Sequence, residues 1–203
     1  MKKRMLALVC FCALIGVVGC EKQANKTEEE AKPSEQETVD AKAQEQDEKS
    51  LVLYFSATGN TEAVAQTLAE ATDSELVEII PETAYSEADL DYGNDQCRAN
   101  QEQNDDAARP GIQNVISIDH YQRIYLGYPI WWGTNPKIIL TLFDEVDFDG
   151  KEVALFCTSG GSGIETSVRE LEAYRESVNW LGGQRFSAGA DASQVRAWVD
   201  SLQ

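Results

Sequence analysis

A short apolar run followed at once by a polar, glycine-containing loop and a helical pattern constrains the fold of this chain most. Residues 50–55 read SLVLYF, without the polar alternation of a strand that has one face in water. Such a run is typical of a parallel strand covered on both faces. The loop Ser56-Ala57-Thr58-Gly59-Asn60-Thr61 comes next, and apolar residues then recur at helical spacing through Glu62–Ala71. This order predicts the first half of a β-α-β unit.

The same alternation of strand and helix continues to the end of the chain. It predicts an α/β fold with a doubly wound, parallel, five-stranded sheet. The further strands are expected at Glu75–Ile80, Arg123–Gly127, Glu152–Cys157 and Gly182–Phe186, and the further helices at Lys137–Asp144, Glu165–Arg175 and Ser193–Leu202.

The segment Pro81–Tyr121, between the second and third predicted strands, breaks this rhythm. It is rich in Asp, Asn and Gln and shows only a weak helical pattern at Glu87–Leu90. A connection of about forty residues in a compact domain is usually functional or disordered. Tyr85, Tyr92 and Arg98 are unusual residues for a disordered acidic segment, which favours an ordered, packed insertion over a surface excursion without a role.

Residues 1–20 have the composition of an export signal. Lys2, Lys3 and Arg4 precede an apolar stretch of signal-peptide length, which ends in Val-Val-Gly-Cys20. This ending resembles the bacterial lipobox, which implies that Cys20 is lipidated and becomes the new N-terminus. An ordinary secretory signal with a coincidental cysteine, or a short uncleaved anchor helix, would be the alternative. The expected location is the outer face of the cytoplasmic membrane, with attachment through the lipid.

Residues 21–50 lack the apolar surface that a packed core requires, so they are predicted to form a disordered charged tether or a charged single helix. Residues 51–203 then form the single globular domain. This part carries a formal charge of −16 out of −18 for the whole chain. A field of that sign repels nucleic-acid phosphates and permits a basic partner surface.

Three loops follow predicted strands at the sheet edge where doubly wound folds bind ligands. The loop 56–61 offers hydroxyl groups, Gly59 and a helix N-terminus, which suit a phosphate; it also fits a simple helix cap. The loop 128–136 contains Trp131 and Trp132, which either cap the core or present a flat face to a planar ring. The loop 158–163 (TSGGSG) exposes backbone groups that can meet the edge of a heterocycle. A phosphate site, an aromatic face and backbone groups for the edge of a heterocycle together predict a site for flavin mononucleotide, FMN.

From about Leu51 to Leu202 the chain resembles the flavodoxin family. The stretches Tyr54–Thr61, Gly127–Gly133 and Cys157–Gly163 carry the resemblance, while the long insertion between the second and third strands departs from an ordinary flavodoxin. The resemblance implies that the FMN phosphate is bound by Ser56, Thr58, Gly59, Asn60 and Thr61. It implies that the isoalloxazine is surrounded by Pro129, Ile130, Trp131, Trp132, Thr158, Ser159, Gly160 and Gly161.

Other chemistries find little support. His120 is the only histidine and is expected in a turn before a strand. A single histidine disfavours a zinc site. The sequence also lacks the Gly-x-Ser-x-Gly motif of a nucleophile elbow, which disfavours a serine hydrolase. Cys157 is expected to pack as an apolar residue. An electron carrier that serves a redox partner protein or a small acceptor is favoured. An FMN-dependent NAD(P)H:quinone-type oxidoreductase and a flavin-free binding lipoprotein of the same fold stay open.

Overall fold

The computed structural model of the chain describes residues 49–202. The predicted signal peptide, Cys20 and most of the tether lie outside the described residues. The described part contains a sheet of five parallel strands, as the sequence predicted, and the strand order is β2-β1-β3-β4-β5. The strands are β1 (Ser50–Tyr54), β2 (Glu75–Glu78), β3 (Arg123–Pro129), β4 (Glu152–Thr158) and β5 (Asn179–Phe186).

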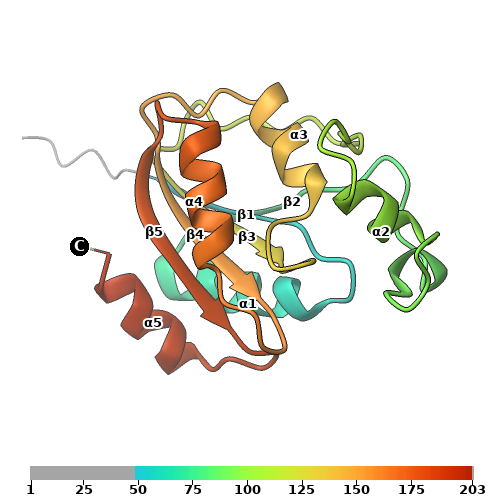
Figure 1. Ribbon diagram of the computed structural model, residues 1–203. Helices are drawn as coiled ribbons and strands as arrows, with labels where there is room; N and C mark the ends of the chain where they lie inside the picture. Colours follow the sequence, from blue (N-terminus) through green and yellow to red (C-terminus); the bar gives the residue numbers. More distant parts are fainter. Residues whose placement is uncertain (1–48, 203) are drawn as a thin grey trace, which may run out of the picture. The chain divides into compact units, whose positions relative to one another are not determined.

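Helices cover both faces of the sheet (Figure 1). The helices α1 (Asn60–Thr72) and α5 (Ala192–Asp200) lie on one face, and α3 (Lys137–Glu145) and α4 (Glu165–Tyr174) on the other. Along β1, Leu51 and Leu53 belong to the core beneath α3 and α4, whereas Val52 and Tyr54 belong to the core beneath α1 and α5. Burial of successive residues on opposite faces is the reason that this strand reads as an unbroken apolar run.

The predicted element boundaries differ from the observed ones by a few residues. The largest difference is in β5, which begins at Asn179 rather than Gly182. Its ladder with β4 is irregular between Val153 and Leu155, so the early part of β5 lacks the period-two pattern of a regular strand. Within residues 49–202, no helix has the length and apolar character needed to cross a membrane.

The insertion between β2 and β3 is packed against the domain, as the ordered interpretation predicted. It contains a 3-10 turn, η1 (Ala88–Leu90), at the weak helical pattern, and a six-residue helix, α2 (Arg98–Gln103), which the sequence did not predict. A helix of six residues is too short to show helical periodicity. Cys97, Ala99 and Ile118 of this segment belong to the core on the α3 and α4 side.

The two ends of the insertion are joined to each other. Pro81 and Ile112 form an antiparallel bridge, and the N–H of Glu82 donates to the carbonyl of Gly111 at 2.8 Å. The Asn114 side chain accepts from the N–H of Ile80 at 2.9 Å and donates to the carbonyl of Glu78 at 2.8 Å. The insertion therefore forms a closed excursion from the end of β2.

Two further predictions are confirmed. His120 lies in an exposed turn immediately before β3. Cys157 is fully buried in the core, and burial raises the pKa of its thiol to about 12. Cys97, which the sequence did not place, is also buried, and its sulfur accepts a hydrogen bond from the N–H of Asn100 at the start of α2.

Candidate functional site

A cleft of about 510 Å³ opens at the carboxyl ends of the parallel strands. Loops that follow β1, β3, β4 and β5 line it together with two residues of the insertion. This edge is where doubly wound sheets bind ligands, because the helix N-termini and the loops converge there. The lining residues are Ala57, Thr58, Asn60, Leu90, Tyr92, Pro129, Ile130, Trp131, Thr158, Ser159, Gly160, Ser187 and Ala188.

The loop after β1 leads into the N-terminus of α1. Gly59 adopts a left-handed conformation with a φ of 81°, which a glycine adopts without steric cost, and α1 begins at Asn60. Among the residues that the structure describes, no side chain caps this end of the helix. Because the first N–H groups of a helix have no partner within the helix, they remain available to an anion at this point.

Ser56 carries the most informative polar atom of this loop. Its Oγ is buried and has no hydrogen-bond partner within residues 49–202. A buried hydroxyl without a partner costs free energy, so such atoms are uncommon in folded proteins and require an explanation. On the same loop, the exposed Thr58 hydroxyl accepts from the side-chain amide of Asn60 at 3.2 Å. This loop therefore carries two hydroxyl groups that can donate a hydrogen bond to an anion.

Thr61 and Thr158 join the first and third loops. Their hydroxyl groups lie 2.8 Å apart, and both side chains are buried. When Thr158 donates, the Thr61 hydroxyl keeps its own proton for another acceptor. The backbone joins the second and third loops, since the N–H of Ile130 donates to the carbonyl of Thr158 at 3.0 Å. All three predicted loops are thus linked to one another.

The second loop presents its two tryptophans differently. Trp131 is buried, and its ring makes edge contacts with Phe55 and Tyr85, at centroid distances of 5.6 and 5.1 Å. Trp132 is 43% exposed and lies in a tight turn closed by hydrogen bonds between Trp131 and Thr134. Its φ is 49°, and that of Gly133 is 85°. Two successive left-handed residues define a type I′ turn, which favours asparagine and glycine rather than tryptophan.

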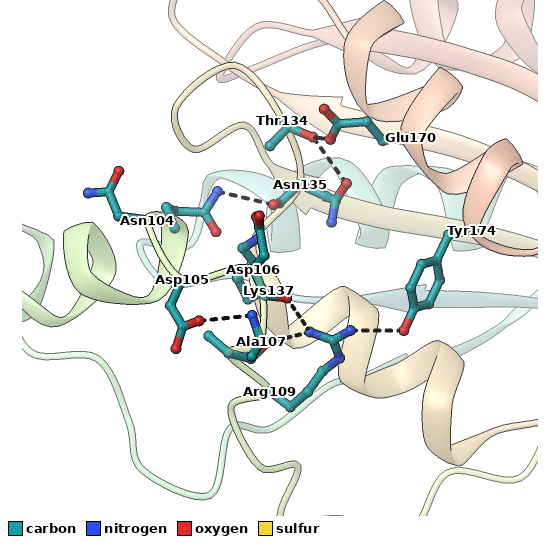
Figure 2. A network of polar contacts seen from close by, with 12 residues as sticks. Asn104, Asp105, Asp106, Ala107, Arg109, Thr134, Asn135, Lys137, Glu170 and Tyr174 are labelled. Carbon is teal, nitrogen blue, oxygen red and sulfur yellow. Dashed lines mark hydrogen bonds and ion pairs between the residues drawn. The ribbon is translucent and has the colours of Figure 1, made fainter.

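The insertion and α4 hold this second loop in place. The side-chain amide of Gln103 in α2 donates to the carbonyls of Trp131 and Asn135, at 3.1 and 3.2 Å. Thr134 donates to Glu170 of α4, and Figure 2 shows this contact above the network around Arg109.

Arg109, which lies in the later part of the insertion, joins the insertion to the helices α3 and α4. It donates to Asp144 at 2.7 Å. It also donates to the hydroxyl of Tyr174 at 3.0 Å (Figure 2). Because Gln103 of the insertion and Glu170 of α4 both contact the second loop, we expect this loop to be rigid.

The side chain of Ser159 stabilises the conformation of the third loop. Its hydroxyl donates to the carbonyl of Ser162 and accepts from the N–H of Gly161 at 3.2 Å. A Cβ at Gly160 or Gly161 would meet open space, so these residues leave room beside the cleft. Arg185 of β5 donates to the carbonyl of Ser159 at 3.1 Å. The three loops contain no lysine or arginine, which makes this guanidinium a cation that reaches the cleft's loops from outside them.

Two acidic residues lie close to each other near the first turn of α1. The pKa of Glu78 is raised by burial and by the neighbouring charge of Glu62, which lies in the first turn of α1. Burial, followed by the charges of Glu78 and Glu62, raises the pKa of Tyr54 to about 12. A bound anion therefore has to rely on N–H and hydroxyl donors rather than on nearby positive side chains.

The structure brings most of the predicted site residues to the cleft. Among the thirteen, eight line it, and Ser56, Gly59 and Thr61 belong to the same loop or helix start as Thr58. Trp132 and Gly161 are not among the lining residues. Five lining residues were not predicted as site residues, namely Ala57, Leu90, Tyr92, Ser187 and Ala188. Ser187 directly follows β5, so the rule about strand ends would have found it, whereas the aromatic character of Tyr92 was the only signal for the insertion.

Comparison with known families agrees with this geometry. A model of the flavodoxin family matches residues 49–202, which is more than half of the chain. The chain belongs to the flavodoxin family. No curated protein gives a significant match to it.

Solved structures similar to this flavodoxin include two from Bacteroides. A protein described as a flavoprotein from Bacteroides uniformis ATCC 8492 is 40% identical, with a TM-score of 0.72, and the match covers 75% of this chain and 97% of that one. A similarly described protein from Bacteroides eggerthii DSM 20697 is 39% identical, with a TM-score of 0.73 and coverage of 76% and 97%. The similarity to both spans the described domain.

A third similar structure contains a cofactor. It is a flavoprotein in complex with FMN from Lactobacillus acidophilus NCFM, which is 30% identical, with a TM-score of 0.55 and coverage of 75% of this chain and 99% of that one. FMN is therefore bound by a homologue of this flavodoxin.

Proposed function

We propose that this flavodoxin binds FMN in the cleft and works as an electron carrier, held at the membrane by a lipid on Cys20. The observation that carries the cofactor assignment is the buried Oγ of Ser56, which has no partner among the described residues and belongs to the loop that leads into the uncapped start of α1. A phosphate monoester supplies the missing acceptor for this hydroxyl and for the free N–H groups of the helix. The FMN complex of the Lactobacillus acidophilus relative supports the assignment.

The two ends of the cleft would bind different parts of FMN, the phosphate at one end and the isoalloxazine at the other. At one end, Ser56, Thr58 and Thr61 would donate their hydroxyl protons to the phosphate, together with backbone N–H groups. At the other end, Pro129, Ile130 and Trp131 would form an apolar wall for the isoalloxazine, next to Thr158–Gly160, which also line the cleft. This apolar wall would exclude water from the part of the ring that it covers.

Bound FMN supplies the redox chemistry, because it accepts and releases electrons. The chain contributes binding, orientation and electrostatics. The charge of −16 on residues 51–203 fits a basic redox partner, which it would attract over long range at low salt.

The lipid anchor is supported by the sequence of the first twenty residues. The basic start, the short apolar stretch and the ending Val-Val-Gly-Cys20 have the order of a lipoprotein signal. Replacement Cys20→Ser should release the protein from the membrane fraction or stall its processing. Normal cleavage with unchanged membrane retention would contradict the anchor.

The cofactor assignment is tested by titration of the full chain, purified in detergent, with FMN and with riboflavin. We expect FMN to bind at least tenfold more tightly, because riboflavin lacks the phosphate. The substitution Thr58→Ala should weaken FMN binding by about 1–3 kcal/mol and leave riboflavin binding almost unchanged. Thr67→Ala is the matched control, because the Thr67 hydroxyl lies outside the cleft and donates to the carbonyl of Ala63, one turn earlier in α1.

Equal affinities for FMN and riboflavin would contradict the phosphate cradle. The carrier assignment has its own test, in which the FMN-loaded protein is mixed with NADH or NADPH and a quinone. A carrier should show no sustained turnover. Rapid steady-state oxidation of either nicotinamide would instead favour the oxidoreductase.

A further inference from the structure

Two residues of the insertion reach the cleft. Leu90 and Tyr92 line it together with Pro129, Ile130 and Trp131, although they lie about thirty-five to forty residues earlier in the chain. Tyr92 is 56% exposed, so its ring is partly in the cleft wall and partly in solvent. An aromatic ring in this position adds a flat apolar surface at the mouth of a cleft that is suited to a planar ligand.

We propose that Tyr92 contacts the isoalloxazine ring of FMN and closes the ring end of the cleft, so that the insertion between β2 and β3 is part of the cofactor site. This inference rests on the proposed binding of FMN. It assigns a cofactor contact to a segment in which the sequence motifs indicated none.

The backbone around Tyr92 is held in a defined turn. The N–H of Tyr92 donates to the carbonyl of Leu90 at 2.9 Å, and the N–H of Asn94 donates to the carbonyl of Asp91 at 2.8 Å. The buried side chain of Asn100 in α2 donates to the carbonyl of Asn94 at 2.7 Å. The turn is therefore fixed to α2, whose Gln103 also holds the second loop of the cleft.

Trp132 of the second loop packs against Tyr92. The two rings make an edge contact with a centroid distance of 4.8 Å and an interplanar angle of 75°. Trp132 occupies a left-handed position that is unfavourable for a residue with a large side chain. Strained residues of this kind persist where the surrounding structure holds them, and they cluster at ligand sites. The pair thus joins the insertion to the second loop beside the cleft.

The ionisation state of Tyr92 suits contact with a redox cofactor. Its pKa is raised, mainly by burial and also by the neighbouring Cys97. The phenol is therefore neutral at physiological pH and adds no charge beside the ring. The contact is expected to be one of shape and dispersion, for which the aromatic face matters and the hydroxyl does not.

The test uses the full chain with Tyr92→Ala, Tyr92→Phe and Val115→Ala. Val115 belongs to the same insertion, is 98% exposed and does not line the cleft, so it is the matched control. We expect Tyr92→Ala to raise the Kd for FMN and for riboflavin by the same factor, about tenfold. It should also increase the fluorescence of the bound flavin, which a contacting tyrosine quenches. Tyr92→Phe should restore the affinity to within about twofold, and Val115→Ala should change neither property.

The outcomes separate this inference from the proposed function. Wild-type protein that binds no FMN would overturn both. Wild-type binding of FMN together with unchanged affinity and fluorescence in Tyr92→Ala would overturn the role of Tyr92 alone, as would a loss of affinity for FMN but not for riboflavin. If Tyr92→Ala does not fold, Tyr92→Leu keeps the apolar bulk without the aromatic face, and the same expected and contrary results apply to it.

Discussion

The substitution Ser56→Ala is expected to have opposite effects on the stability of the flavin-free protein and on FMN binding. The Oγ of Ser56 is buried without a partner, and an unsatisfied buried hydroxyl costs about 1–3 kcal/mol. Removal of this atom should therefore stabilise the flavin-free protein by about 1 kcal/mol, at the lower end of that range because Cβ keeps its contacts. For a domain of this size, about 1 kcal/mol corresponds to roughly 2–4 °C in Tm.

The same hydroxyl should stabilise the complex. A hydrogen bond to a charged group contributes about 1.5–3 kcal/mol, so Ser56→Ala should raise the Kd for FMN by roughly ten- to 150-fold. At a fixed excess of FMN, the gain in Tm on adding the cofactor should consequently shrink, since this gain follows the ratio of ligand concentration to Kd. Thermal unfolding with and without FMN, together with fluorescence titration, measures both effects on one sample.

Ser74→Ala is the matched control for Ser56→Ala. The Ser74 hydroxyl has partners in Ser50, at 2.5 Å, and Thr72, at 2.6 Å, and it lies outside the cleft. Its removal should destabilise the protein by about 0.5–1.5 kcal/mol and leave the Kd for FMN unchanged. If Ser56→Ala destabilised the flavin-free protein as Ser74→Ala does, or left FMN binding intact, the assignment of Ser56 to the phosphate would be refuted.

Three further predictions concern strain, charge and pH. At Trp132, valine should be less stable than asparagine by about 1–2 kcal/mol in urea unfolding, because asparagine tolerates the left-handed backbone and a β-branched residue does not; equal stabilities would count against the strain. The midpoint potential of the FMN-loaded protein should lie below that of free FMN, and Arg185→Gln should lower it further, on the order of 20 mV at low salt and less at high salt. An unchanged potential in a spectroelectrochemical titration would remove Arg185 from the electrostatics of the site. Burial raises the pKa of the Cys157 thiol from 9.0 to about 12. The contribution of the neutral thiol to the free energy of unfolding should therefore be complete below pH 9 and lost as the pH rises toward 12. Urea unfolding at pH 8 and pH 10.5 measures this loss, which should be smaller in Cys157→Ala.

Sequence reasoning predicted the parallel sheet and three of the loops at the cleft because their causes are local. A buried strand, the loop that follows it and the next helix are contiguous, and each leaves its own pattern of apolar residues. The carboxyl ends of parallel strands meet at one edge of the sheet, so local patterns were enough to bring Thr58, Trp131 and Ser159 to one cleft.

The tertiary structure decided how those loops are supported and what completes the cleft. The pairing of Thr61 with Thr158 spans 97 positions, and the contact from Gln103 to the carbonyl of Trp131 spans 28. Neither contact leaves a periodic signal, because it depends on two segments meeting in space. The helix α2 was missed for a related reason, since its six residues are held by packing and by contacts to the second loop.

For the Oγ of Ser56, the sequence determined one property and the tertiary structure determined another. The sequence alone determined that a hydroxyl follows the first strand at the start of a helix, which is a position suited to a phosphate. Only the folded structure shows that this hydroxyl is buried without a partner, and that Tyr92 lies in the wall of the same cleft. Burial and partner choice depend on every segment packed around an atom, so they are properties of the tertiary structure and not of any local stretch of sequence.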